Sequence, residues 1–193
     1  MRELAILVFV SLDGVMQAPG SATEDPSGGF DMGGWAAPFW DGVMPHVERT
    51  AMSEPYDVVF GRRTYDLFAS YWPNATKSVA SDRLNTAEKF VATSTPLEVH
   101  WQNSRALTGD VMQEIRRLKS QDAPLLQVHG SARLIQSLLE HDLIDEFRIW
   151  TFPVLLGEGK RLFGGTSSPA NLRLTAAEEL PNGVLSSVYR RRT

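Results

Sequence analysis

Two segments of the chain limit what it can fold into, because in each a short apolar run ends at a glycine and an amphipathic helix follows. The first segment spans residues 58–65 and turns at Gly61, and the second spans residues 125–134 and turns at Gly130. The apolar runs suit buried strands, and the first N–H groups of a helix have no partner within it. Such N–H groups favour phosphate, and glycine lets a ligand approach the backbone. The two segments therefore predict that the chain binds a phosphate-bearing cofactor at two points.

The composition restricts the class of protein. The chain has 193 residues, of which 42% are hydrophobic, and no linker-like stretch divides it, which predicts a single domain over residues 1–193. A net charge of -4 argues against a general nucleic-acid-binding protein, because binding the phosphate backbone needs a dense basic surface. The absence of cysteine excludes disulfides and thiol nucleophiles, and the four histidines lack the spacing of a metal site, so no metal is expected.

The N-terminal apolar run, residues 4–12, is the first predicted strand. It has no basic n-region and no small-residue cleavage site, and it is too short to span a bilayer. It ends at Asp13 and Gly14, which are typical of a turn. We therefore expect a cytoplasmic protein with no membrane partner.

Strands and helices alternate through the middle of the chain. Further strands are predicted at residues 56–60, 90–93, 125–129 and 146–156, and helices at 41–52, from Thr64 onwards, at 110–119 and at 132–141. The Asn182-Gly183 pair between two alternating runs indicates a closing β-hairpin. This order predicts an α/β fold with a mostly parallel central sheet, helices on both faces and a C-terminal antiparallel hairpin. A ligand would bind at the carboxyl ends of the strands, where the glycine turns open.

The side chains at these turns allow a functional and an ordinary interpretation. Arg62, Arg63 and Thr64 supply two guanidinium groups and a hydroxyl at a helix start, which suits the 2′-phosphate of NADPH. The same residues also suit a plain helix start with solvated arginines. Residues 93–95 offer hydroxyls at a strand exit, and residues 130–133 lack the spaced glycines of the dinucleotide fingerprint. Either run is equally consistent with an ordinary turn.

The order of these motifs resembles the dihydrofolate reductase-like superfamily. The motifs are residues 11–14, 61–65, 93–94 and 128–133, followed by a stretch at 143–163 that contains Pro153-Val154-Leu155-Leu156-Gly157-Glu158-Gly159. That stretch is similar to the reductase domain of the riboflavin-pathway enzymes, the RibD C-terminal domain, and its stand-alone relatives. The resemblance runs through nearly the whole chain and implies the fold of that superfamily with NADPH as cofactor.

The resemblance also implies roles for individual residues. The residues that would hold the adenosine-side phosphates are Gly61, Arg62, Arg63 and Thr64, with Thr93 and Ser94 beside them. The residues that would cradle the pyrophosphate are Gly130, Ser131, Ala132 and Arg133. Phe9 and Met16 would flank the nicotinamide. Trp35 would lie beside cofactor and substrate, with a buried loop anchor as its alternative role.

The substrate side is less defined. Asp13 and Asp41 are the carboxylates assigned there, although each is also an ordinary turn or cap residue. The glycine-rich segment 17–38 would be a lid, since loops of this length are usually functional or mobile.

The expected function is an NADPH-dependent reduction of a small heterocyclic or ribosyl-linked substrate, most specifically 5-amino-6-(5-phosphoribosylamino)uracil. A dihydrofolate or pterin reductase and a non-catalytic nucleotide-binding protein are the alternatives. A homodimer is expected because the relatives pair. The apolar strand through Phe147, Ile149, Trp150 and Phe152 also suggests more surface than one core needs.

Overall fold

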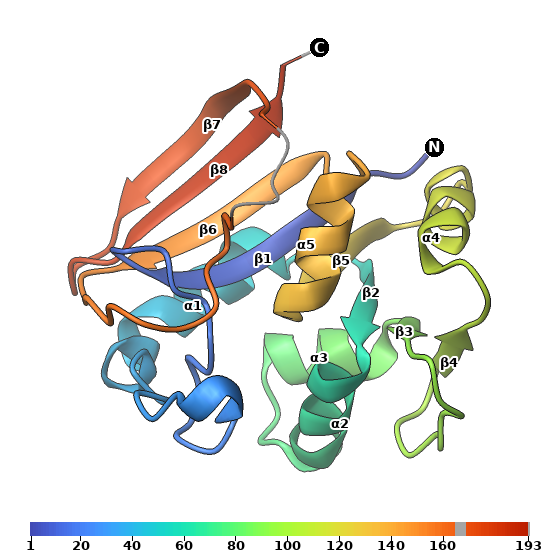
Figure 1. Ribbon diagram of the computed structural model, residues 1–193, viewed down its shortest axis with the longest axis horizontal. Helices are drawn as coiled ribbons and strands as arrows, with labels where there is room; N and C mark the ends of the chain where they lie inside the picture. The colour runs from blue at the N-terminus through green and yellow to red at the C-terminus, as the bar shows by residue number, and fades with distance from the viewer. Residues whose placement is uncertain (165–168, 193) are drawn as a thin grey trace.

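A computed structural model describes residues 1–164 and 169–192, and in it one sheet runs through the molecule (Figure 1). The sheet has eight strands in the order β4-β3-β2-β5-β1-β6-β8-β7. The strands are β1 (Leu4–Ser11), β2 (Tyr56–Gly61), β3 (Lys89–Ala92), β4 (Ser104–Leu107), β5 (Leu125–His129), β6 (Glu146–Phe152), β7 (Leu172–Glu179) and β8 (Leu185–Arg191). Neighbours from β4 through to β6 are parallel, and the β6–β8 and β8–β7 pairs are antiparallel. The predicted sheet with its closing hairpin is confirmed.

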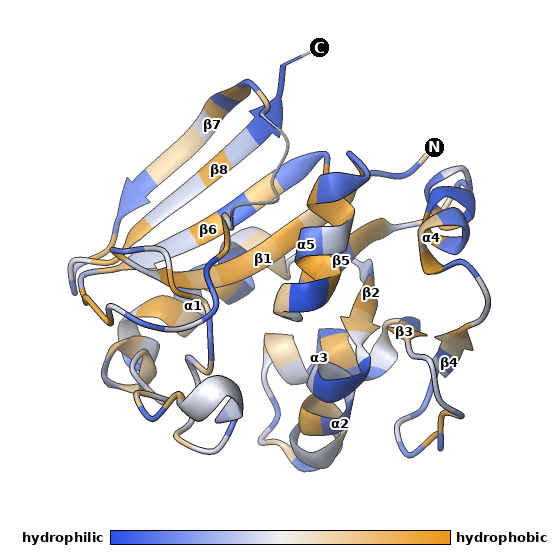
Figure 2. Cartoon of the chain, in the orientation of Figure 1, coloured by the Kyte–Doolittle hydropathy of each residue, from blue (hydrophilic) through white to orange (hydrophobic). Residues whose placement is uncertain are grey.

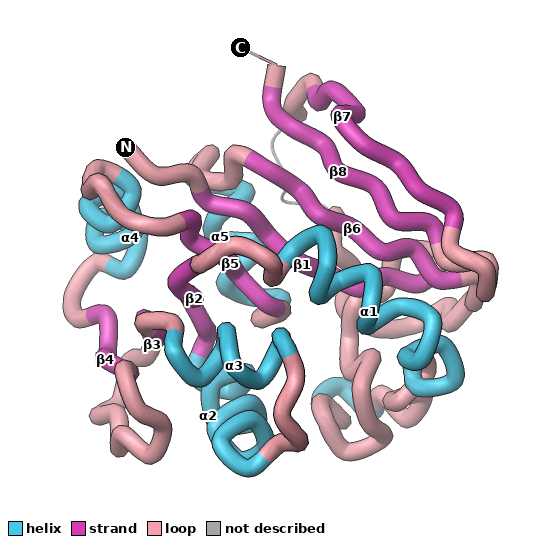
Figure 3. Tube along the Cα trace, turned by 180° about the vertical axis from the view of Figure 1, so that it is seen from behind, coloured by secondary structure: helices cyan, strands magenta, loops and turns pink. Residues whose placement is uncertain are grey.

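Helices cover both faces of this sheet. They are α1 (Trp40–Ala51), α2 (Arg62–Tyr71), α3 (Val79–Thr86), α4 (Val111–Lys119) and α5 (Ala132–Glu140), with short 3-10 turns at Ser27–Gly29, Ala37–Phe39 and Trp72–Asn74. The buried apolar residues of α1, α2 and α3 share one cluster, and those of α4 and α5 share a second. Figure 3, seen from behind, shows α1 and α3 in front of the sheet, and Figure 1 shows α5 on the opposite face.

Strand β1 forms the centre of both cores. Its side chains alternate between the faces, so that Leu7 packs in the first cluster while Leu4, Ile6, Val8 and Val10 pack in the second. The strand is paired on both sides, with β5 and with β6. Its near-continuous apolar sequence, visible as an orange ribbon in Figure 2, follows from this double burial.

Two elements, α3 and β4, were not predicted, and Lys89 lies between them. This lysine is fully buried at the start of β3. Its Nζ donates to the carbonyls of Asn85 at 3.2 Å, Ala87 at 2.8 Å and Gln102 at 3.1 Å, and it lies 4.4 Å from the centroid of the Trp101 ring. The ammonium group thereby closes the C-terminal end of α3 and holds the segment that leads into β4.

Strand β6 is shorter and more buried than the sequence indicated. It ends at Phe152 rather than at residue 156, because Pro153 has no N–H to continue the ladder. Phe147, Ile149, Trp150 and Phe152 are each at most 7% exposed within this single chain. The interpretation that these side chains leave spare surface for a second copy was therefore wrong.

Candidate functional site

The two glycine turns lie side by side at the carboxyl ends of two neighbouring central strands. Strands β2 and β5 are parallel neighbours, with Val58 opposite Gln127. The N–H of Gly61 donates to Ser131 Oγ at 2.8 Å, and that hydroxyl donates to Thr64 Oγ1 at 2.6 Å. A Cβ on Gly61 would lie 2.8 Å from Ser131 Oγ, so only glycine fits this approach. Segments about 70 residues apart in the chain thus meet directly.

Helices α2 and α5 both begin where these two turns meet, at the junction formed by Gly61, Thr64 and Ser131. Within the described residues, no side chain caps either helix, whose N-cap residues are Gly61 and Ser131. Gly130 and Ser131 both have positive φ, 71° and 64°, and a left-handed serine is an uncommon conformation that often marks a functional site. The Ser131 hydroxyl contacts the neighbouring turn instead of capping its own helix. The first-turn N–H groups of both helices, including those of Ala132 and Arg133, are therefore suited to bind an anion.

The arginines of the first turn are already paired with carboxylates. Arg62 Nε donates to both oxygens of Asp66, each at 2.9 Å, and its Nη1 donates to the Pro96 carbonyl at 3.0 Å. Arg63 donates through Nη1 to Asp25, which lies in the glycine-rich loop. Arg133, on the first turn of α5, is exposed. The basic groups expected for a phosphate thus surround the junction.

The strand exit at residues 93–96 lies next to Arg62, because Gly61 is opposite Ala92 in the sheet. Thr93 Oγ1 donates to the Thr95 carbonyl at 3.0 Å and accepts from its N–H at 3.2 Å, so this hydroxyl stabilises its own turn. Ser94 is exposed. The atoms that reach Arg62 come from Thr95 and Pro96, and the sequence interpretation did not assign Pro96.

An aromatic cluster lies beside the carboxyl ends of β1 and β6. Phe9 is centred 5.0 Å from Trp40 and 5.8 Å from both Trp150 and Phe152, and Trp35 is 5.3 Å from Phe152. The sequence interpretation missed Trp40, Trp150 and Phe152. The i, i+2 spacing of Trp150 and Phe152 could have shown that both side chains lie on one face of their strand.

Two of the residues expected near the nicotinamide have other surroundings. Met16 is buried in the cluster of α4 and α5, whereas Phe9 packs against the cluster of α1, so the structure does not bring these side chains together. Trp35 is 8% exposed, and its Nε1 donates to the Gln17 carbonyl at 2.8 Å. These contacts match the alternative role of Trp35 as a loop anchor.

Asp13 is held by the protein itself. Ser11 Oγ donates to it at 2.6 Å, and the N–H groups of Leu156 and Gly157 donate at 3.2 and 2.8 Å. The Ser11 hydrogen bond, followed by those backbone donors, overcomes the opposing effect of burial and lowers the pKa of Asp13 to about 2. These hydrogen bonds give Asp13 a structural role in its own turn, and its assignment to the substrate side stays a prediction.

Asp41 lies exposed on the first turn of α1. Glu48, seven residues later on the same helix face, accepts from the N–H of Ala80 in α3 at 3.1 Å. Asp41 is therefore on the side of α1 that is turned toward α3. Of the two carboxylates assigned to substrate, it is the one without a structural contact in the described residues.

His129 is the ionisable residue next to Gly130. It is buried, and its Nε2 lies 2.7 Å from Gln127 Oε1. Burial, with the nearby charge of Arg148, lowers the pKa of His129 to about 3. The imidazole is therefore neutral and is not a proton donor at neutral pH.

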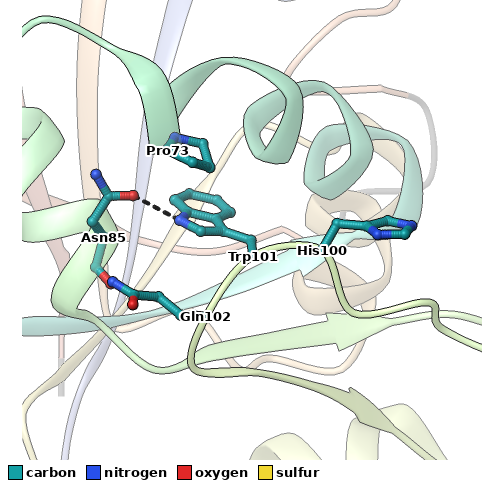
Figure 4. Close-up of a pocket in the computed structure, with 5 residues that line it drawn as sticks. All are labelled: Pro73, Asn85, His100, Trp101 and Gln102. Atoms are coloured by element: carbon teal, nitrogen blue, oxygen red, sulfur yellow. Dashed lines mark hydrogen bonds between the residues drawn. The ribbon is translucent and has the colours of Figure 1, made fainter.

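A separate pocket of about 370 Å³ lies near the far end of α2 (Figure 4). It is lined by Pro73, Asn85, His100, Trp101 and Gln102. The Asn85 side chain is already occupied, because it accepts from Trp101 Nε1 at 2.7 Å and donates to the Trp72 carbonyl at 3.1 Å. The Trp101 ring also packs against Phe60 and Tyr65, with ring centroids 6.1 and 6.3 Å apart.

The family of the chain follows from a match that covers almost all of it. The family model of the RibD C-terminal domain matches residues 2–186. The chain belongs to the RibD C-terminal domain family. The resemblance seen in the order of the motifs is thereby confirmed.

Two curated relatives of this RibD C-terminal domain come from Bacillus subtilis (strain 168). The uncharacterised protein YyaP is 29% identical over 193 residues, which cover 97% of this chain and 94% of that protein. The uncharacterised protein YwjB is 25% identical over 186 residues, covering 95% of each.

Solved structures of low identity share the fold of this RibD C-terminal domain. A candidate riboflavin biosynthesis protein from Shewanella sp. PV-4 matches with a TM-score of 0.68 at 22% identity, covering 100% of both chains. A pyrimidine reductase-like protein from Corynebacterium diphtheriae has a TM-score of 0.69 at 11% identity, covering 100% of this chain and 92% of that one. Dihydrofolate reductase from Enterococcus faecalis, complexed with NADP(H), has a TM-score of 0.62 at 15% identity, covering 99% and 97%. The predicted dihydrofolate reductase-like fold is confirmed.

The described part of this RibD C-terminal domain has neither a membrane-spanning helix nor a cluster of metal ligands. None of the helices in residues 1–164 and 169–192 is long and apolar enough to cross a membrane. Over the same residues, no three histidine, aspartate or glutamate side chains gather as a metal site.

Proposed function

We propose that this RibD C-terminal domain protein is an NADPH-dependent reductase of a small heterocyclic or ribosyl-linked substrate. The observation that carries the proposal is the hydrogen-bonded junction of Gly61, Thr64 and Ser131, where two helix N-termini without side-chain caps lie together. One dinucleotide could contact both. The family and the likeness to reductases of the same fold support this proposal.

The protein would contribute binding and orientation. The backbone N–H groups that follow Gly61 and Gly130 would bind the cofactor phosphates, and Arg62, Arg63 and Arg133 would neutralise their charge. When bound, NADPH supplies the hydride. Holding the reactants in contact and excluding water can account for roughly 7–11 kcal/mol of barrier lowering, so the protein needs little acid or base strength.

The substrate would lie against the half-buried aromatic rings of Phe9 and Trp40, which suit a flat heterocycle. Asp41 would contact its polar groups from the first turn of α1. The specific proposal is 5-amino-6-(5-phosphoribosylamino)uracil, in line with the family, and the same aromatic surface also suits a pterin or dihydrofolate.

A nucleotide-binding protein without catalysis is the second candidate. The observation in its favour is the state of Asp13, whose carboxylate is held ionised by Ser11 and the backbone and therefore does not supply a proton at neutral pH. The two candidates share the cofactor junction and differ in what happens after the cofactor binds.

Titration of the protein with NADPH and with NADH, followed by fluorescence, tests the junction. Binding of NADPH is expected, and failure of both nucleotides to bind would overturn every version of the proposal. A panel of pyrimidine, pterin and aldehyde substrates, followed by loss of the reduced-nicotinamide absorbance, then separates an enzyme from a binding protein.

A further inference from the structure

Asp25 connects three parts of the molecule at the cofactor junction. Its Oδ1 accepts from Arg63 Nη1 on α2, and its Oδ2 accepts from Lys160 Nζ in the segment after β6. Ser27 Oγ donates to Asp25 at 2.7 Å and lies 2.7 Å from Lys160 Nζ. A carboxylate of the glycine-rich loop therefore occupies the space between two cationic groups.

The backbone around Asp25 is held in place independently of this carboxylate. We name residues 17–30 the strap. The buried Gln17 side chain donates through Nε2 to the carbonyls of Asp25 and Ser27, each at 2.9 Å, and its Oε1 accepts from the Lys160 N–H at 2.9 Å. Of the two cationic partners of Asp25, Arg63 lies nearer the surface. The Arg63 side chain is 62% exposed, while that of Asp25 is 16% exposed. The Asp25–Arg63 pair can therefore open while Gln17 keeps the base of the strap fixed.

Both arginines on the first turn of α2 face a carboxylate before any ligand binds. Asp66 pairs with Arg62 and Asp25 pairs with Arg63, so each guanidinium group faces one carboxylate. Burial raises the pKa of Asp25, but the hydrogen bonds from Lys160 and Ser27 lower it overall, so the carboxylate is ionised. Asp66 is four residues from Arg62 on the same helix and stays beside it. Asp25 and Arg63 belong to separate elements, so their contact can open at the exposed guanidinium group.

We propose that Asp25 is a specificity-determining residue, whose carboxylate competes with the 2′-phosphate of NADPH for Arg63. A phosphate dianion on Arg63 would lie next to the Asp25 carboxylate, and two anions sharing one guanidinium group repel each other. Occupancy of the phosphate position and the Asp25–Arg63 contact therefore exclude one another. The inference rests on the proposed NADPH site. It predicts that Asp25 weakens binding of ligands with a 2′-phosphate and does not affect NADH.

The test compares ligands that differ only in this phosphate, measured by calorimetry on the full chain. The ligands are NADPH against NADH and 2′,5′-ADP against 5′-AMP, and the variants are Asp25→Asn and the control Asp31→Asn, which removes the same charge from an exposed position of the same loop. Asparagine at position 25 can still accept from Ser27. Asp25→Asn is expected to bind NADPH and 2′,5′-ADP about 3-fold to 10-fold more tightly, the range of an opened exposed ion pair and relieved repulsion. NADH, 5′-AMP and the Asp31→Asn protein are expected to change by less than about 2-fold.

A double-mutant cycle with Arg63→Gln shows whether the effect passes through Arg63. In the Arg63→Gln background, Asp25→Asn is expected to change the affinity for 2′,5′-ADP by less than about 2-fold. An undiminished gain in that background, or weaker binding of NADPH by Asp25→Asn alone, would overturn the competition. If NADPH binds and Asp25→Asn leaves its affinity unchanged, the inference about Asp25 is wrong and the proposed function still stands. If no nucleotide binds to any variant, both the inference and the proposed function are wrong.

Hydrogen exchange of the strap gives a second readout that does not depend on affinity. Peptides that cover residues 20–30 are expected to exchange faster with 2′,5′-ADP bound and to stay unchanged with 5′-AMP, because coupling between two sites is reciprocal. Slower exchange with 2′,5′-ADP would mean that Asp25 closes over the phosphate, and the proposal would then be wrong.

Discussion

Lys89 shows how one buried charge can join two irregular segments. Its three N–H groups match three carbonyls, and removing them would break three hydrogen bonds, of which the one to Ala87 is fully buried. We expect Lys89→Met to lower the free energy of unfolding by about 2–3 kcal/mol, measured by urea denaturation. Lys77→Met, at an exposed position, is the control and is expected to change it by less than about 0.5 kcal/mol.

The same lysine predicts a pH dependence of stability. Burial lowers the pKa of Lys89 from 10.5 to about 8. Between these two values the unfolded chain binds more protons than the folded one, so this group makes the folded state more stable as the pH rises from 8 towards 10.5. The difference in unfolding free energy between wild type and Lys89→Met is expected to grow over that window and to be constant below it. A difference that is flat across the window would contradict the lowered pKa.

Asp13 is expected to behave as a structural carboxylate. Its pKa is lowered from 3.8 to about 2, so its stabilising contribution is complete above the first value and is lost as the pH falls towards the second. Asp13→Asn should therefore unfold at a lower temperature than wild type at neutral pH, and this difference should disappear in acid. If reductase activity is found, its pH profile should keep its shape in Asp13→Asn; a lost limb of that profile would show that Asp13 takes part in catalysis.

At the scale of elements, the sequence predicted the helices and strands in which the turn residues at the ends agree with the hydrophobic periodicity between them. The glycine turns after residues 60 and 129, the Asn182-Gly183 hairpin and the apolar stripe of α5 were all visible locally. Helix α3 and strand β4 were not, because α3 has few apolar residues and β4 has only four residues with one of them buried. Their positions depend on Lys89 and Trp101, whose contacts are made only in three dimensions.

The candidate site also has features that the sequence predicted and features that it did not. Order along the chain was enough to predict that the two glycine turns meet, since parallel neighbours bring their carboxyl ends together. It could not show that Arg63 is already paired, because Asp25 is 38 residues away from it, whereas the partner of Arg62 is four residues along the same helix. Nor could it show the aromatic cluster, which collects Phe9, Trp40 and Phe152 from three separate elements.

The close approach of the glycine turns makes a stability prediction. Gly61→Ala would place a methyl group 2.8 Å from Ser131 Oγ, so the two turns must separate. We expect a loss of about 1–3 kcal/mol in unfolding free energy together with weaker nucleotide binding. Gly164→Ala is the control, since its nearest contact would be 3.6 Å. Unchanged stability and affinity in Gly61→Ala would mean that the turns tolerate separation.

The charge of the first turn makes a prediction about cofactor choice. Arg62→Ala combined with Arg63→Ala is expected to weaken binding of NADPH far more than binding of NADH, because only NADPH carries the 2′-phosphate. Fluorescence titration with both nucleotides measures the two affinities. Equal losses would show that the phosphate lies elsewhere.

At the scale of the whole molecule, β7 is an edge strand that offers surface for a second copy, whereas β6 lies inside the sheet. Residues 173–179 of β7 are exposed, and among the described residues the strand pairs with β8 alone. An edge of this kind is a template for pairing with another chain. We propose that a homodimer forms there, so light scattering should give twice the mass of one chain.

Leu174→Lys tests this edge, because a charge there opposes strand pairing. Leu174 is 51% exposed, so the change should not affect the fold of one chain. The expected result is a monomer with an unchanged circular dichroism spectrum. A dimer that persists in Leu174→Lys, or a wild-type protein that is monomeric at micromolar concentration, would exclude this edge as the interface.

The place of β1 between β5 and β6 has a consequence for synthesis on the ribosome. Strand β1 emerges before its two partners, which end at His129 and Phe152, so the middle of the sheet stays open until both have been translated. Until then an apolar ribbon of eight residues lacks its neighbours. Nascent chains of this protein should therefore rely on chaperones that shield such a segment, and chains stalled before β6 has left the exit tunnel should be sensitive to protease.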